Sequence, residues 1–362
     1  MKAAEGPTIH QSVVTMLLAR STGSISVEFR NWTWFKKQLD SHSLLSSLLD
    51  MTKTCTSRST TILFMSSTLT QWPGGVSPSE IYEKLTRIAD VHGNLRLYPN
   101  RSELNRAHHK VGDIRALDMI ADDSEHVFSF RPRTCFGTGP CTLAHLDQSE
   151  RMVLKRAYSC GAADVVITDP SDRNSLLCTL SDQEPSTDFN EQLWFHQEYV
   201  ASLHTLGEFR VFIKSQTPIS SRKNGYIICA AKSRVDWDTK GFATRQVNIV
   251  DDFGWSYDGN DVNLKKEAAN SKYKEMCDFA IHVYSKLRQR HDADECYESL
   301  EIGVRLDIGV SQLCPEGRFF VNEITRWYAA DFFSSLVLPQ PHIAICRAYA
   351  EGLTEYFTTV KL

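Results

Sequence analysis

The segment from residue 300 to residue 310 constrains the fold most, because apolar residues alternate along it with polar residues or glycines. It reads Leu-Glu-Ile-Gly-Val-Arg-Leu-Asp-Ile-Gly-Val. Successive side chains of a β-strand point to opposite faces. One face of this strand is therefore apolar, and the other carries Glu301, Arg305 and Asp307 with two glycines. The pattern predicts a sheet that packs one face into a core and offers the other to a polar group.

A second strand, which ends near Thr325, follows after a turn around Pro315. If the hairpin is centred on that proline, Asp307 lies opposite Glu323 and Arg305 lies opposite Thr325. Opposed Cβ atoms are about 4.5 to 5.5 Å apart, so two facing carboxylates repel each other unless a cation lies between them. Mg²⁺ suits this position, since it takes carboxylate oxygens and keeps coordination sites for phosphate. The alternative is a solvated hairpin face with a cross-strand pair of Arg and Glu.

The composition is that of a globular protein, with 362 residues, 42% hydrophobic and 23% charged, which predicts two or three domains. The 40 Lys and Arg residues against 44 Asp and Glu residues give a net charge of −4, so no overall field favours a nucleic acid. The apolar stretch at residues 12–19 is too short to span a membrane, and no cleavage site of small residues follows it. We therefore expect a cytoplasmic protein with neither a nucleic-acid nor a membrane partner.

Hydrophobic periodicity predicts an N-terminal α/β layer followed by β-rich segments. In the first third we expect strands over 61–66 and 95–98, and helices over 77–91 and 102–119. An antiparallel sheet is expected from strands over 151–156, 165–168, 194–200, 209–214 and 226–234. Helices are expected over 270–290 and 342–356, with the strands of the hairpin over 300–310 and 318–325.

A lysine ahead of a loop of small residues is a candidate phosphate-binding element. Lys155 lies near the end of a predicted strand, and Ser159 and Gly161 lie in the loop that follows. The lysine supplies a point charge, and a loop of small residues lets backbone N–H groups approach anionic oxygens closely. Taken alone, this pattern is more often an exposed strand end.

The hairpin motifs resemble those of the ATP-grasp superfamily, especially its D-alanine–D-alanine-ligase-like carboxylate–amine ligases. The signature of that group is an Arg-x-Asp strand followed by an Asn-Glu-x-Asn strand. Here the motifs read Arg-Leu-Asp from residue 305 and Asn-Glu-Ile-Thr from residue 322, and the resemblance spans roughly residues 110 to 331. It implies that Mg²⁺ is bound by Asp307, Glu323 and Thr325. Thr325 departs from the asparagine of the family, with water or Asn322 as the alternative ligand.

The resemblance also implies nucleotide contacts, in the order along the chain that the family's fold requires. Glu198 and the backbone of the next two residues would bind adenine, and Glu208 would bind the ribose, because a carboxylate accepts from both hydroxyls of a diol. Judged singly, both glutamates are equally well explained as surface acids of edge strands. The implied nucleotide-binding residues are Lys110, Lys155, Ser159, Gly161, Glu198, Tyr199, Val200 and Glu208.

Three cations are the candidate catalytic residues. Arg305 and Lys155 would face the negative charge that develops during phosphoryl transfer. Lys232 alternates onto one face of its strand, which makes it a candidate for the γ-phosphate or the substrate carboxylate. Arg326 and Trp327, directly after the second hairpin strand, are further candidates for substrate contact.

These observations predict an α+β protein with an ATP-grasp fold. We expect an N-terminal α/β domain over residues 1–110 and two β-rich subdomains, over 111–200 and 201–362, that clamp ATP. The resemblance implies a ligase that uses ATP and Mg²⁺ to activate a small-molecule carboxylate as an acyl phosphate and join it to an amine, with a homodimer left open. The alternatives are a small-molecule kinase and a non-catalytic ATP-binding assembly factor similar to ATP-grasp-like chaperones of translation initiation, whose strands include a motif like residues 208–212.

Overall fold

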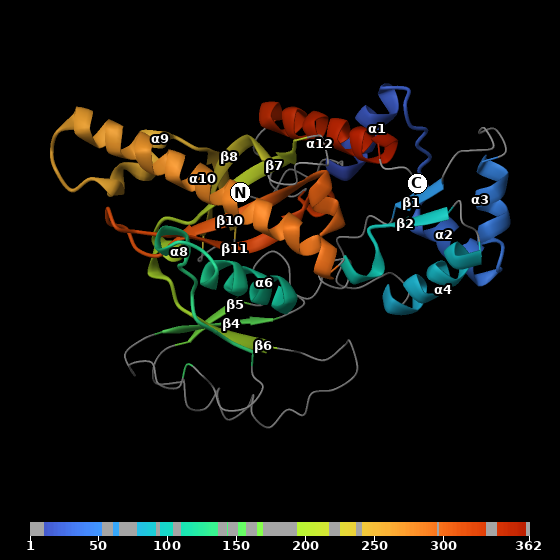
Figure 1. Ribbon diagram of the computed structural model, residues 1–362, viewed down its shortest axis with the longest axis horizontal. Coiled ribbons are helices and arrows are strands. Elements are labelled where there is room, and N and C mark those ends of the chain that lie inside the picture. The colour runs from blue at the N-terminus through green and yellow to red at the C-terminus, as the bar shows by residue number, and fades with distance from the viewer. Residues whose placement is uncertain are drawn as a thin grey trace.

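The computed structural model has an α+β architecture, with three separate sheets among the described residues (Figure 1). The residues that it describes are 11–52, 61–64, 78–91, 95–103, 110–136, 143, 151–156, 165–168, 194–216, 225–236, 241–294, 297–330 and 339–359. Within these ranges, no helix combines the length and the apolar character needed to cross a membrane.

The N-terminal part is a small α/β layer, as expected. Strands β1 and β2 pair in parallel, and helix α4 connects them. Helix α4 buries Ile81, Tyr82 and Leu85 against apolar side chains of α2 and α3, which gives this layer its own core. The elements are α1 (Gln11–Ser21), α2 (Trp32–Asp40), α3 (Leu44–Thr52), β1 (Thr61–Phe64), α4 (Pro78–Val91) and β2 (Leu95–Tyr98).

A four-stranded antiparallel sheet follows, in the order β3-β6-β4-β5. Its strands are β3 (Thr134–Cys135), β4 (Met152–Arg156), β5 (Val165–Thr168) and β6 (Trp194–Glu198). Strand β6 is shorter than predicted, because the short helix α8 (Ala201–Thr205) begins soon after it.

The largest sheet has five antiparallel strands in the order β11-β10-β7-β8-β9. The hairpin of β10 and β11 forms one edge of this sheet, and β7 is the inner neighbour of β10. The strands are β7 (Glu208–Ser215), β8 (Gly225–Asp236), β9 (Gly241–Gln246), β10 (Gly303–Val310) and β11 (Phe319–Arg326).

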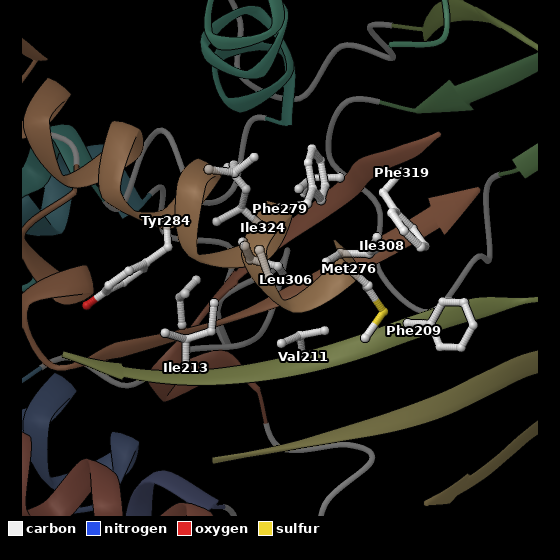
Figure 2. Packing of buried hydrophobic residues seen from close by; sticks show 14 of the residues in the cluster. Phe209, Val211, Ile213, Met276, Phe279, Tyr284, Leu306, Ile308, Phe319 and Ile324 are labelled. Carbon is white, nitrogen blue, oxygen red and sulfur yellow. The ribbon is translucent and has the colours of Figure 1, made fainter. Parts of the chain in front are cut away.

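One face of this sheet packs against the long helix α10 (Val262–Asp294), whose predicted range was shorter at both ends. Each apolar side chain that is fully buried here contributes about 1.5 to 3 kcal/mol relative to exposure. Helix α9 (Ile249–Phe253) and the 3-10 turn η3 (Gly254–Ser256) extend the same layer. The core residues labelled in Figure 2 are Phe209, Val211, Ile213, Met276, Phe279, Tyr284, Leu306, Ile308, Phe319 and Ile324.

At one end, the opposite face is covered by helix α12 (Pro339–Thr359), against which α1 packs. Gly303 makes this approach possible, because a Cβ atom there would lie 2.3 Å from Cε1 of Tyr349 and 2.6 Å from the carbonyl oxygen of Ile213. The glycine at this position of the alternating pattern therefore serves close packing.

The first hairpin strand begins at Gly303 and not at residue 300, because the 3-10 turn η4 (Glu298–Glu301) precedes it. The carboxylate of Glu301 is buried in an ion pair with Arg288 of α10. Glu301 therefore does not belong with Arg305 and Asp307 on the polar side of β10, as the alternation had suggested. Helix α6 (Lys110–Asp122), followed by η1 (His126–Phe128), packs against β11 and α10. It thus lies with the five-stranded sheet, although it falls in the range predicted for the small subdomain.

Candidate active site

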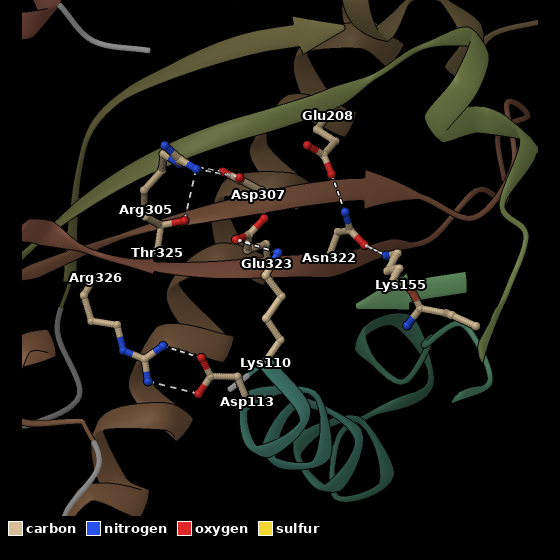
Figure 3. Close-up of polar contacts among 11 residues, drawn as sticks. Lys110, Asp113, Lys155, Glu208, Arg305, Asp307, Asn322, Glu323, Thr325 and Arg326 are labelled. Carbon is tan, nitrogen blue, oxygen red and sulfur yellow. Dashed lines mark hydrogen bonds and ion pairs between the residues drawn. The ribbon is translucent and has the colours of Figure 1, made fainter. Parts of the chain in front are cut away.

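The hairpin has the predicted register at its polar residues. Asp307 lies opposite Glu323 and Arg305 lies opposite Thr325. After Asp307 the register shifts, so that Ile308 pairs with Val321 and a β-bulge forms. Because a bulge inserts an extra residue and redirects side chains locally, Asn322 can join the same polar cluster (Figure 3).

Strand β7 extends this cluster, since Asp307 also pairs with Arg210 and alternation places Glu208 on the same side. We call this side of the sheet the polar face. It is defined by the side chains of Glu208, Arg210, Arg305, Asp307, Asn322, Glu323 and Thr325.

Arg305 and Asp307 form a buried pair with two hydrogen bonds. The Nε and Nη2 atoms of Arg305 donate to the two carboxylate oxygens of Asp307, each over 2.8 Å. The side chains are only 6% and 2% exposed, so water screens this pair weakly. Nη2 also donates to the hydroxyl of Thr325 over 3.0 Å. Burial lowers the pKa of Arg305, but Asp307 and Glu323 outweigh burial and raise it overall.

Glu323 lies beside Lys110, the first residue of α6. Their Oε1 and Nζ atoms are 3.3 Å apart, and both side chains are partly exposed. Burial favours the neutral acid, but Lys110 and Arg305 outweigh burial and hold the pKa of Glu323 below its ordinary value. Glu323 is thus an ionised carboxylate at the open end of the polar face.

Lys155 connects the four-stranded sheet with the polar face. Its ammonium group donates to the side-chain oxygens of Gln197, over 2.7 Å, and of Asn322, over 2.8 Å. Burial lowers its pKa to about 8, although Glu208 and Glu323 act in the opposite direction. Lys155 is therefore a largely charged lysine near neutral pH and holds its charge less firmly than an exposed lysine does.

Glu208 accepts a hydrogen bond from the amide group of Asn322 (Figure 3). Burial and the nearby charge of Asp307 raise the pKa of Glu208, against the lowering effect of Arg210. Burial lowers the pKa of Arg210 to about 10, while Asp307 acts to raise it. The guanidinium remains charged at neutral pH.

Lys110 of α6 and Lys155 of β4 reach the polar face, and with them the balance of charge favours an anionic ligand. Together, four cationic side chains stand against three carboxylates, which leaves one positive charge in excess. A partly buried surface of that sign attracts phosphates, because charges interact more strongly where water is excluded. The cations are Lys110, Lys155, Arg210 and Arg305, and the carboxylates are Glu208, Asp307 and Glu323.

The fit of Mg²⁺ depends on the same hairpin. Two carboxylates and the amide oxygen of Asn322 are hard oxygen donors of the kind that Mg²⁺ prefers. In the part of the chain that the structure describes, no group of three or more His, Cys, Asp or Glu side chains could hold a metal ion. Two carboxylates and one amide oxygen would leave the other coordination positions of a bound Mg²⁺ to phosphate oxygens and water.

Lys232 is not brought to the polar face. Lys232 on β8 pairs with Phe209 of β7, a core residue, and its ammonium group donates to Asp252 of α9 over 2.7 Å. Asp252 also accepts from Arg245, so the three residues tie β8, β9 and α9 together. Lys232 does lie on one face of an alternating strand, as predicted. The sequence did not show whether that face was the polar face or the face covered by helices.

The residues expected to bind adenine have protein partners in the structure. The carboxylate of Glu198 accepts from the backbone N–H of Arg133 over 3.1 Å and from its Nε over 3.2 Å. The N–H groups of Glu198 and Tyr199 donate to the carbonyl oxygens of Arg133 and Arg151, and Val200 is the N-cap of α8. On β6 it is Gln197 that contacts Lys155. The two loop residues of the phosphate element, Ser159 and Gly161, lie outside the described residues.

The two residues after Thr325 are packing residues. Arg326 is buried against Asp113 of α6. Trp327 donates from Nε1 to the hydroxyl of Tyr98 over 2.9 Å and stacks on Phe64. Trp327, directly after β11, contributes to the contact between the hairpin and the N-terminal layer.

Arg210 is the residue of the polar face that sequence reasoning passed over as a site residue. Its alternation with Glu208 was visible in the sequence, because residues two apart on a strand share a face. What the sequence lacked was the pairing of β7 with β10, two strands that are almost a hundred positions apart in the chain.

No protein-family model matches the chain, and no curated protein matches its sequence. Among solved structures, the chain is similar to D-cycloserine synthetase DcsG, with 13% identity and a TM-score of 0.46 over 76% of this chain and 78% of that chain. It is also similar to D-alanyl-alanine synthetase A from Vibrio cholerae O1 biovar eltor str. N16961, with 10% identity and a TM-score of 0.36 over 76% of this chain and 74% of that chain. Both likenesses are distant.

Proposed function

We propose that this protein is an ATP-dependent ligase that joins a carboxylate to an amine with Mg²⁺ as its metal. One observation carries the proposal. Asp307 lies opposite Glu323 on the polar face, where, together with Lys110 and Lys155, four cations stand against three carboxylates. Such a face supplies what phosphoryl transfer needs most, which is neutralisation and alignment of charge.

The nucleotide would lie between the four-stranded sheet and the polar face. Lys155 supports this placement, because its ammonium group already spans the two sheets through Gln197 and Asn322. Lys110 would add a second charge beside Glu323, and Glu208 would meet the ribose hydroxyls. The adenine contacts of residues 198–200 and the loop contacts of Ser159 and Gly161 remain part of the proposal.

Asp307, Glu323 and the amide oxygen of Asn322 would hold the metal, and Thr325 is the remaining candidate ligand. Bound Mg²⁺ would neutralise charge on the phosphate oxygens. The hydroxyl of Thr325 accepts from Arg305 in the structure, whereas the oxygen of Asn322 accepts from Lys155. Asn322 and Thr325 are thus the two candidates for the third oxygen ligand beside the carboxylates.

The residues of this face suit the activation of a carboxylate. A carboxylate oxygen of the substrate would attack the γ-phosphorus of ATP, and the bond from this phosphorus to the bridging oxygen would break. ADP would depart with that oxygen, and the substrate would become an acyl phosphate. Arg305 and Lys155 would stabilise the charge that builds up on the transferring group. The amine would then attack the carbonyl carbon, lose a proton and expel phosphate, which yields an amide.

ATP consumption with pairs of small acids and amines tests the proposal. We expect ADP and phosphate to form only when a carboxylate and an amine are both present, and Glu323→Gln to abolish this. ADP formation with a hydroxyl compound alone would instead identify a kinase. Nucleotide binding without turnover would favour a non-catalytic assembly factor. The strand from Glu208 to Phe212 resembles a strand motif of such factors.

A further inference from the structure

Helix α6 lies along the outer edge of the five-stranded sheet, beside the edge strand β11 (Figure 3). Its first turn contacts that strand at two places. Lys110 reaches Glu323 on the polar face, and Asp113 reaches Arg326 at the end of the strand. Because residues three apart on a helix share one side, both contacts come from the side of α6 that faces β11.

The contact between Asp113 and Arg326 is buried. Both guanidinium nitrogens Nη1 and Nη2 donate to the Asp113 carboxylate, the second over 3.0 Å, and the residues are only 6% and 1% exposed. The hydroxyl of Tyr297 donates to the same carboxylate over 3.2 Å, and the guanidinium lies over the Tyr297 ring. A buried pair with a fixed fork of hydrogen bonds resists displacement, since either charge left alone would be costly.

The contact between Lys110 and Glu323 is of the opposite kind. The two atoms are 3.3 Å apart, and the side chains are 26% and 40% exposed. A half-exposed ion pair of this length does little to hold a helix in place. The position of the Lys110 ammonium group must therefore be set by a stronger contact nearby, and the nearest one on α6 is the Asp113–Arg326 pair.

We propose that Asp113 and Arg326 are positioning residues that hold the first turn of α6 so that Lys110 meets Glu323 and the phosphates. The pair acts through Lys110 and touches neither nucleotide nor metal. The proposal rests on the proposed function, because the purpose of this placement is nucleotide binding.

A double-mutant cycle on the affinity for a non-hydrolysable ATP analogue with Mg²⁺ tests the proposal. We expect Asp113→Asn and Lys110→Gln each to weaken binding by about tenfold, and Asp113→Asn to add less than about twofold once Lys110 is already replaced. Full additivity of the two effects would overturn the proposal, because it would show that Asp113 acts independently of Lys110.

Asp118→Asn is the matched control. Asp118 lies further along the same helix and accepts from Nε of Arg131 over 2.9 Å, while Arg131 also donates to the Val321 carbonyl of β11. Its replacement weakens the same contact between helix and strand away from the first turn. We expect it to lower stability without coupling to Lys110→Gln, and equal coupling from Asp118 would overturn the proposal.

Unfolding by urea keeps this test separate from the proposed function. In the free protein, Lys110→Gln and Glu323→Gln should be coupled in stability, and Asp113→Asn should abolish that coupling. If the analogue does not bind to the wild type, the proposed function fails while this cycle still tests the positioning. Coupling between Lys110 and Glu323 that survives in Asp113→Asn would contradict the positioning role of Asp113.

Discussion

Arg305 donates a hydrogen bond to each carboxylate oxygen of Asp307, both over 2.8 Å, so a candidate catalytic cation and a candidate metal ligand neutralise each other on the polar face. Glu323, directly across the hairpin from Asp307, has a longer and more exposed contact with Lys110. The two candidate metal ligands therefore have unequal structural roles.

This inequality predicts different stability costs for two isosteric replacements. Asp307→Asn leaves the buried charge of Arg305 without its partner and should cost about 3 to 5 kcal/mol of unfolding free energy. Glu323→Gln should cost at most about 1 kcal/mol, since its ion pair is partly exposed. Urea unfolding of both variants measures the difference, and equal costs would show that the pair of Arg305 and Asp307 is not buried as described.

Lys155 predicts a pH dependence of nucleotide affinity. Its pKa of about 8 in the free protein lies below the ordinary 10.5 because of burial. Phosphates favour the charged form, so affinity should be constant with respect to this group below about pH 8 and fall by up to about tenfold per pH unit above it. Lys155→Arg keeps its charge at high pH. Equilibrium dialysis of an ATP analogue between pH 7 and pH 10 should show the decline in the wild type and not in this variant, and identical profiles would refute it.

Local pattern was enough to predict the hairpin and its pairing. The alternation around Arg305 and Asp307 sets the side-chain directions, and the turn near Pro315 sets the register, so the positions opposite Glu323 and Thr325 followed from short-range geometry. The same reasoning could not find the bulge at Asn322. A bulge depends on one inserted residue and on what packs beside it.

Long-range pairing was out of reach for the sequence. Lys232 was predicted to contact a phosphate, but it lies on the face of the sheet that the helices cover. Periodicity separates the two faces of a strand without saying which one a helix covers. Arg326 was expected near a substrate, yet Asp113, far earlier in the chain, buries it. Gly303 lies on the face of the strand that was expected to meet a polar group, whereas in the structure it makes room for Tyr349.

Glu103 predicts a pH dependence of stability. Burial raises its pKa from 4.5 to about 7, against the effects of Arg326 and Ser299. The folded protein thus binds the proton more tightly than the unfolded chain, so this contribution to stability is complete below pH 4.5 and is lost as the pH rises to about 7. The change is on the order of 3 kcal/mol. Glu103→Gln should flatten the pH profile of the unfolding free energy between these values, and an unchanged slope would contradict the burial of an ionisable Glu103.

Lys232→Met separates the two faces of the sheet. The replacement removes one donor to Asp252, which keeps Arg245 and the backbone N–H of Asn248 as partners. We expect a loss of about 1 to 3 kcal/mol in unfolding free energy, with ATP consumption per folded molecule unchanged. A loss of turnover at full stability would place Lys232 in the chemistry after all.

The proposed role of Asp307 and Glu323 is to hold a divalent metal ion against nucleotide phosphates. Electron paramagnetic resonance of Mn²⁺, used in place of Mg²⁺, measures this binding directly when free and bound metal are counted with a non-hydrolysable ATP analogue present. We expect wild-type protein with the analogue to bind Mn²⁺ and Glu323→Gln, folded to the same extent, to lose most of this binding. Equal Mn²⁺ binding by the wild type and by Glu323→Gln would show that Glu323 does not hold the metal.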